Sequence, residues 1–142
     1  MRPMLDPQRF LDAQSPVLDA VRHELQAGRK RSHWMWFVFP QLRCLGRSPT
    51  ALHYGLDDLD DARAYLAHPI LGPRLIDCAT LVRSHPEKDL HAIFGSPDDI
   101  KFRSCMTLFA AAAGEAGPTI FDATLTDRFK GIGDPLTLQA IA

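Results

Sequence analysis

The chain has 142 residues, of which 46% are hydrophobic and 23% are charged, and its formal net charge is −1. This length and composition predict one folded domain over residues 1–142 and argue against an intrinsically disordered chain. A net charge so close to zero excludes a general electrostatic attraction of the whole molecule to nucleic acid. One face of the molecule can still be basic.

Signals for helix starts recur along the chain, each a serine or aspartate followed by proline. The first residue of such a pair can cap a helix. Proline suits the first helical position because its missing N–H costs no hydrogen bond there. The pairs therefore predict many short helices. They are Asp6-Pro7, Ser15-Pro16, Ser48-Pro49, Ser96-Pro97 and Asp134-Pro135.

Apolar spacing supports a helix after Ser15-Pro16, and Gly28 suits the left-handed position just beyond its end. The next element, residues 34–39, is a run of six apolar residues that fits either a buried strand or a helical turn capped by Ser32. No second strand is evident to pair with it, and an unpaired strand would leave its backbone groups unsatisfied. We therefore favour a helical turn.

Further helices are predicted over residues 58–67, 71–83, 100–113, 118–130 and 135–142. The helix over Ile100–Ala113 has the strongest signals, because Asp98 and Asp99 precede it and Gly114 follows it. Together these elements predict an all-α fold, a single compact domain of about six to eight short helices.

The cysteines and the apolar runs indicate where the protein resides. Cys44, Cys78 and Cys105 are far apart and odd in number, which is typical of a reducing compartment. Residues 1–6 lack the apolar stretch of a signal peptide, and no run approaches the ~20 apolar residues of a membrane span. We expect a cytoplasmic protein that does not bind a membrane.

A first candidate site is the segment Lys30–Trp36, in which cations adjoin His33 and two indoles. This mixture suits an anionic, planar ligand such as a nucleotide, held by charge-assisted hydrogen bonds and by stacking. The alternative is that Trp34 and Trp36 belong to the core, that the cations form a solvated helix end and that His33 is a cap. The sequence leaves both interpretations open.

A second candidate is the start of the Ile100–Ala113 helix. Lys101, Ser104 and Cys105 share one face there, and Asp98 stands one turn before Lys101. A Lys–Ser pair can activate a hydroxyl nucleophile if burial lowers the pKa of the lysine. The more common meaning is an Asp98–Lys101 contact beside a packed Ser104. A mid-helix Cys105 lacks the helix N-terminus that lowers a thiol pKa, so a Cys105–His33 pair is disfavoured.

Metal and phosphate motifs are not recognisable in the sequence. The six histidines have no HxH or HxxxH spacing and no neighbouring cysteine. The turn at residues 131–134 lacks the lysine of a P-loop, and the acids at 57–61 lack the central glycine of a calcium loop. We expect no cofactor and no metal.

The stretch Gly28–Gln41, with the sequence GRKRSHWMWFVFPQ, resembles the characteristic motif of the bacterial family called domain of unknown function 1810. The resemblance spans nearly the whole chain. It implies a mainly helical fold and no reaction, since the activity of that family is not established. It places His33, Trp34, Trp36, Gln41, Lys101 and Ser104 within motif blocks. The later blocks are Tyr65-Leu66 with His68-Pro69, Leu71–Leu75, Ile93–Gly95 with Asp98-Asp99 and Lys101, Ser104 with Met106–Phe109, and Asp134-Pro135 with Thr137-Leu138.

These features lead to the hypothesis that a small anionic, nucleotide-like ligand binds in a cleft between the Lys30–Gln41 segment and the Ile100–Ala113 helix. The cations would bind the negative charge of the ligand, an indole would stack on it, and His33 would be the acid or base because histidine titrates nearest neutrality.

The alternative is a protein-interaction or structural module without chemistry. Nucleic acid is the least favoured partner, and whether the protein is an enzyme stays open. The candidate catalytic residues are His33, Lys101 and Ser104, and the candidate ligand-binding residues are Lys30, Arg31, Trp34, Trp36 and Gln41.

Overall fold

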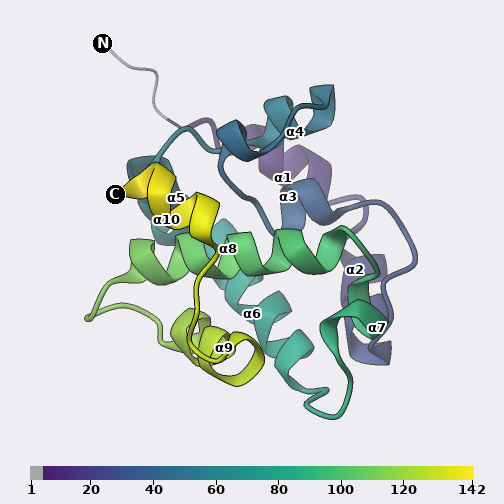
Figure 1. The fold of residues 1–142 in the computed structure, drawn as a ribbon. Helices are drawn as coiled ribbons and strands as arrows, with labels where there is room; N and C mark the ends of the chain where they lie inside the picture. Colours follow the sequence, from purple (N-terminus) through teal and green to yellow (C-terminus); the bar gives the residue numbers. More distant parts are fainter. Residues whose placement is uncertain (1–4) are drawn as a thin grey trace.

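The computed structural model describes residues 5–142, and over this range the chain is built from helices joined by short turns (Figure 1). In chain order the elements are α1 (Gln8–Gln14), α2 (Leu18–Ala27), α3 (Met35–Val38), the short 3-10 helix η1 (Arg43–Leu45), α4 (Pro49–Tyr54), α5 (Leu59–Ala67), α6 (Leu71–Arg83), α7 (Leu90–Phe94), α8 (Asp98–Ala113), α9 (Ile120–Phe129) and α10 (Pro135–Ile141).

The prediction of an all-α fold is confirmed. The described residues hold no strand, and their single β-bridge joins Leu42 to Leu56. The ten α-helices exceed the expected six to eight because α3, α4 and α7 have only four, six and five residues. Helices this short carry too little periodicity to be counted reliably from sequence. None of the helices between residues 5 and 142 has the length and apolar character needed to cross a bilayer. The prediction that residues 1–6 lack a signal peptide concerns mostly residues 1–4, which lie outside the described range.

Side-chain caps start four of these helices. Ser48 accepts the N–H of Ala51 at 3.1 Å, and Asp134 accepts the N–H of Thr137 at 2.9 Å, so both predicted cap-and-proline starts are confirmed. Asp58 and Asp89 cap α5 and α7 in the same way. The α7 start was not predicted, because no proline marks it.

Three of the predicted starts are displaced. Helix α1 begins at Gln8 behind Pro7, α2 at Leu18 behind Val17 and α8 at Asp98 behind Pro97, and none has a side-chain cap. The prolines are tolerated near these starts. Asp6 still accepts the N–H of Gln8 at 3.0 Å, whereas the hydroxyls of Ser15 and Ser96 accept no helical N–H. The predicted end of α2 is confirmed, because Gly28 is left-handed (φ 72°) and the N–H of Arg29 donates to the carbonyl of Glu24 at 3.0 Å.

Helix α8 crosses the middle of the molecule and packs against α5, α7, α9 and α10 (Figure 1). Its residues from Phe102 to Phe109 are buried except for Arg103. Such burial is expected of a helix that is apolar nearly all round. Its first turn, by contrast, reaches the surface at Ile100 and Lys101. The start of α8 is therefore the part of the core helix that can present side chains to a ligand.

Candidate functional site

One buried carboxylate holds the segment that follows α2. Glu24, 9% exposed, accepts the backbone N–H groups of Arg31 (2.6 Å) and Ser32 (2.9 Å), the hydroxyl of Ser32 (2.6 Å) and the indole N–H of Trp34 (3.0 Å). Burial opposes the charged form, but these four donors outweigh it and lower the pKa of Glu24 to about 2. The loop after Gly28 is thereby tied back onto α2.

The two tryptophans of this segment have different environments. Trp34 is 1% exposed, donates to Glu24 and packs against Phe39, so it belongs to the core. Trp36 is only partly buried and reaches the surface of the molecule. Of the two indoles proposed for stacking, only Trp36 can therefore touch a bound ligand.

Asp98 joins the segment to the start of α8. Its carboxylate oxygens lie 3.0 Å from Nζ of Lys30 and 3.2 Å from Nζ of Lys101. Nζ of Lys101 in turn lies 3.8 Å from the ring centroid of Trp36, a cation–π contact. The structure thus brings Lys30, Trp36 and Lys101 to one place, although one face of Trp36 is already occupied by an ammonium group.

Beside this group lies a cavity of about 220 Å³, here called the polar cavity after the polar side chains in its wall, although most of the wall surface is apolar. Its walls come from α3 and the segment after it, from Pro97 and the first two turns of α8, and from the start of α10. Its lining residues are Trp36, Gln41, Leu45, Pro97, Ile100, Lys101, Ser104, Asp134 and Leu136.

Two polar side chains in this wall keep unused hydrogen-bonding groups. Gln41 is 8% exposed, and its side-chain amide makes no hydrogen bond within residues 5–142. Asp134 is 9% exposed; its Oδ2 accepts the N–H (2.9 Å) and the hydroxyl (2.7 Å) of Thr137, whereas its Oδ1 has no donor in the described chain. The unused atoms of both side chains keep contact with solvent, because the fully buried side-chain atoms without a partner in residues 5–142 are Nε of Arg9 and Nε of Arg43. On a cavity wall, such atoms can hydrogen-bond a ligand.

Ser104, Cys105 and His33 have three different environments. The hydroxyl of Ser104 donates to the carbonyl of Ile100 at 3.3 Å and not to Lys101. Cys105 is fully buried, and burial raises its pKa well above the ordinary value, which leaves it as an unreactive thiol. His33 is exposed and does not line the polar cavity.

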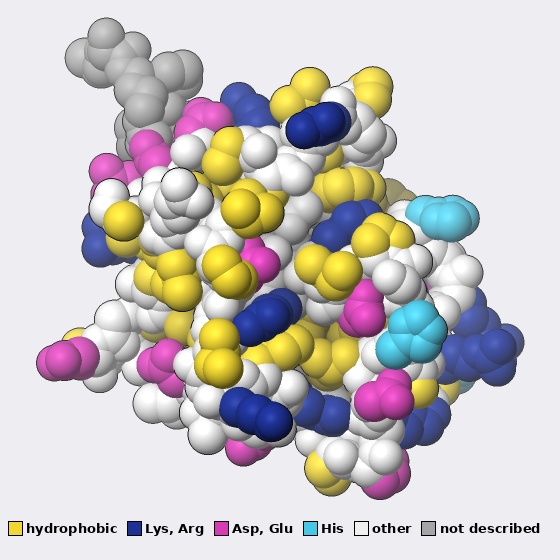
Figure 2. Space-filling view, in the orientation of Figure 1, with side chains coloured by type: hydrophobic (Ala, Val, Ile, Leu, Met, Phe, Trp, Pro, Cys, Tyr) yellow, Lys and Arg dark blue, Asp and Glu magenta, His cyan; other side chains and the backbone are white. Residues whose placement is uncertain are grey.

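Arg31 also lies outside the polar cavity. Together with Arg29 and Lys30 it lines a separate open hollow of about 490 Å³ on the loop between α2 and α3. Figure 2 shows Lys and Arg side chains gathered at the right-hand edge of the molecule. Arg29 and Arg31 are exposed in this hollow, whereas the side chain of Lys30 is only 8% exposed and pairs with Asp98.

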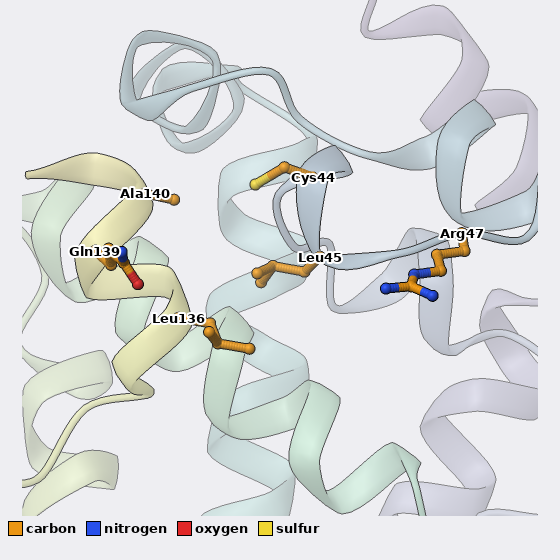
Figure 3. Close-up of a pocket in the computed structure, with 6 residues that line it drawn as sticks. All are labelled: Cys44, Leu45, Arg47, Leu136, Gln139 and Ala140. Carbon is orange, nitrogen blue, oxygen red and sulfur yellow. The ribbon is translucent and has the colours of Figure 1, made fainter.

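A larger hollow of about 460 Å³, the outer hollow, opens between η1 and α10 (Figure 3). Cys44 and Leu45 point across it toward α10, which supplies Leu136, Gln139 and Ala140. Leu45 and Leu136 line both the outer hollow and the polar cavity, so the two adjoin. The outer hollow has no buried polar group in its wall and extends the site mainly by apolar surface.

Asp134 is the site residue that sequence reasoning missed. The Asp-Pro pair was interpreted as a helix cap only, and Asp134 does cap α10. Its position on the cavity wall depends on its backbone N–H donating to the hydroxyl of Thr107 at 2.9 Å, across 27 residues of chain. No local sequence pattern predicts that contact. Within residues 5–142, no three His, Cys, Asp or Glu side chains converge in a way that would hold a metal ion.

Comparison with known proteins gives a family but no activity. A family model described as "Protein of unknown function (DUF1810)" matches residues 4–141. The crystal structure of the conserved hypothetical protein Rv1873 from Mycobacterium tuberculosis is similar, with a TM-score of 0.91 and 49% sequence identity, over 96% of this chain and 98% of that one. No curated protein matches the chain.

Proposed function

The chain belongs to the DUF1810 family of proteins of unknown function, and from its own geometry we propose that it binds a small anionic ligand in the polar cavity. The observation that carries the proposal is Gln41. The residue is 8% exposed and lines the cavity, and its amide makes no hydrogen bond to the other described residues. An amide on a cavity wall that has no partner in the protein is available to hydrogen-bond a ligand.

Lys101 supplies the positive charge of the site. Its ammonium is held between Asp98 and the face of Trp36, so it is positioned before any ligand arrives. A second cation, Lys30, also contacts Asp98, which leaves this group of three charges with an excess of one positive charge. An anionic group entering the cavity beside Lys101 would complete the pairing.

The size of the cavity limits the ligand. About 220 Å³ is below the ~300–1,000 Å³ of typical pockets for drug-sized ligands. A carboxylate or phosphate on a small carbon skeleton fits better than a whole nucleotide. Because Lys101 covers one face of Trp36, we propose that this indole bounds the ligand rather than stacking on a base.

Binding is the extent of the proposal. His33, the candidate acid or base, is exposed and apart from the cavity lining, and Ser104 has no base within hydrogen-bonding distance. We therefore expect His33→Ala to leave ligand binding unchanged.

An interaction module is the second candidate, and exposed apolar side chains favour it. Ile100 and Leu136, at the mouth of the polar cavity, are 59% and 63% exposed. Figure 2 shows hydrophobic side chains gathered across the middle of this face, with single charged groups among them. A partner protein would cover these side chains without needing Gln41 or Lys101.

The test is a thermal-shift screen of the full chain against inorganic phosphate, small carboxylates, sugar phosphates and nucleotides. A ligand at one hundred times its dissociation constant adds about 2.7 kcal/mol to the free energy of unfolding. We expect a small anion to give such a shift, Lys101→Met to abolish it and Gln41→Leu to weaken it.

The matched control is Lys130→Met, which removes one exposed lysine that does not line the polar cavity. It should keep the full shift. Equal shifts in the Lys101→Met and Lys130→Met variants would mean that the anion binds elsewhere, and the proposal would then be wrong.

A further inference from the structure

The charges that surround the polar cavity point to a second group on its ligand. We propose that the ligand is a small zwitterion, with a carboxylate at Lys101 and an ammonium group at Asp134, as in a free α-amino acid. This inference rests on the proposed function and specifies the class of molecule that the same cavity takes.

Asp134 is the charge without a counterpart. The residue is 9% exposed, and the partners of its carboxylate are the neutral N–H and hydroxyl groups of Thr137. Asp134 also lines a neighbouring hollow together with the cation Arg103, but Arg103 donates to the carbonyls of Ile132 and Gly133. A buried carboxylate is costly unless a cation or several donors pair with it. A ligand cation placed in the cavity would supply that pairing.

The cavity also offers the number of acceptors that an ammonium group requires. An ammonium has three N–H donors and no acceptor. Three residues of the wall each have an oxygen that can accept: Asp134 has Oδ1, Gln41 has its amide oxygen and Ser104 has its hydroxyl oxygen. The Ser104 hydroxyl directs its own hydrogen to Ile100, so its lone pairs are left for a ligand. The three acceptors and the single cation Lys101 complement the two ends of one zwitterion.

The remaining wall suits a small apolar side chain. Leu45, Pro97, Ile100 and Leu136 line the same cavity, and its volume of about 220 Å³ leaves room for only a short carbon skeleton. A simple carboxylate would leave Asp134 unpaired, and a dianion would place negative charge beside it. A simple amine would leave Lys101 with Asp98, which it shares with Lys30, as its anionic partner. Each of these is a poorer match than the molecule that carries both groups.

The experiment compares three matched probes by calorimetry on the full chain: L-alanine, propanoate, which lacks the amino group, and ethylamine, which lacks the carboxylate. Glycine, serine, valine and leucine extend the series. We expect at least one amino acid to bind about tenfold or more tightly than its deamino analogue, since a hydrogen bond between charged groups has about that effect.

Asp134→Asn is the decisive variant. Asparagine caps a helix about as well as aspartate, so α10 should keep its start while the cavity loses its negative charge. Amino-acid affinity should fall about tenfold, whereas propanoate affinity should not fall. The control Asp89→Asn makes the same change at the exposed cap of α7 and should alter neither affinity.

The outcomes separate the two proposals. If carboxylates bind in a Lys101-dependent way but amino acids bind no more tightly, the zwitterion is wrong and anion binding stands. Equal amino-acid affinity in the parent and the Asp134→Asn variant would also overturn the zwitterion. If no anion and no amino acid binds, both proposals fail.

Discussion

Glu24 shows how much of the site depends on one residue. Its carboxylate collects four donors from the loop between α2 and α3 and thereby decides that Trp34 faces inward. Trp36, two residues later, is left at the surface over Lys101. From the sequence alone the two indoles were indistinguishable, because the partner that separates them is a glutamate on the preceding helix.

We predict that Glu24→Gln destabilises the protein by about 2–3 kcal/mol at pH 7, since its pKa falls from 4.5 to about 2 on folding. A lowered pKa stabilises the folded state fully above pH 4.5, and this contribution is lost as the pH falls toward 2. Urea unfolding between pH 7 and pH 2.5 measures it. The difference between parent and variant should shrink with acidity.

Glu115→Gln, at an exposed turn residue, is the control and should change stability by less than about 0.5 kcal/mol at every pH. A Glu24→Gln penalty that did not diminish at low pH would show that packing, and not the charge, holds the loop.

At the scale of the elements, helix ends followed local rules and helix starts followed them in part. Gly28 ends α2 in the left-handed conformation, as its position predicted. Helix α9 ends differently. The predicted helix over residues 118–130 included Lys130, but α9 ends at Phe129, and Lys130 just beyond it adopts the left-handed conformation (φ 56°). The reason is that the N–H groups of Lys130 and Gly131 both donate to Leu125.

The left-handed Lys130 gives a prediction for α9. A residue with a Cβ atom in this conformation is strained by about 1 kcal/mol or more, and glycine is not. We expect Lys130→Gly to raise the free energy of unfolding by about 0.5–1 kcal/mol, measured by urea denaturation. Lys130→Ala keeps the Cβ atom and should give no such gain. A loss of stability in Lys130→Gly would mean that the freedom of the unfolded chain outweighs the relief of strain.

At the scale of the molecule, α8 organises both the core and the site. Buried side chains from nearly all the helices form one continuous hydrophobic cluster around it, and the polar cavity lies over its first two turns. A ligand in that cavity would touch the most buried helix directly, which is why binding should be visible as a gain in global stability.

One continuous core predicts one cooperative unfolding transition over residues 1–142. Tryptophan fluorescence reports on Trp34 and Trp36 between α2 and α8, whereas far-ultraviolet circular dichroism reports on all helices. The two melting curves should coincide within about 1 °C. Separate midpoints would show that the chain contains two folding units and would contradict the single-domain prediction.

By itself, the sequence determined which segments are helical and where most of them stop. Caps, prolines and terminal glycines influence the backbone over three or four residues. The Asp98–Lys101 contact of 3.2 Å, which helical spacing predicted, likewise joins residues three positions apart. Only the tertiary structure decided which side chains share the cavity. Gln41, Lys101 and Asp134 are far apart in the chain and meet because α8 packs against α10 and against the loop that Glu24 holds. Such contacts depend on the packing of whole elements, which no local pattern of residues encodes.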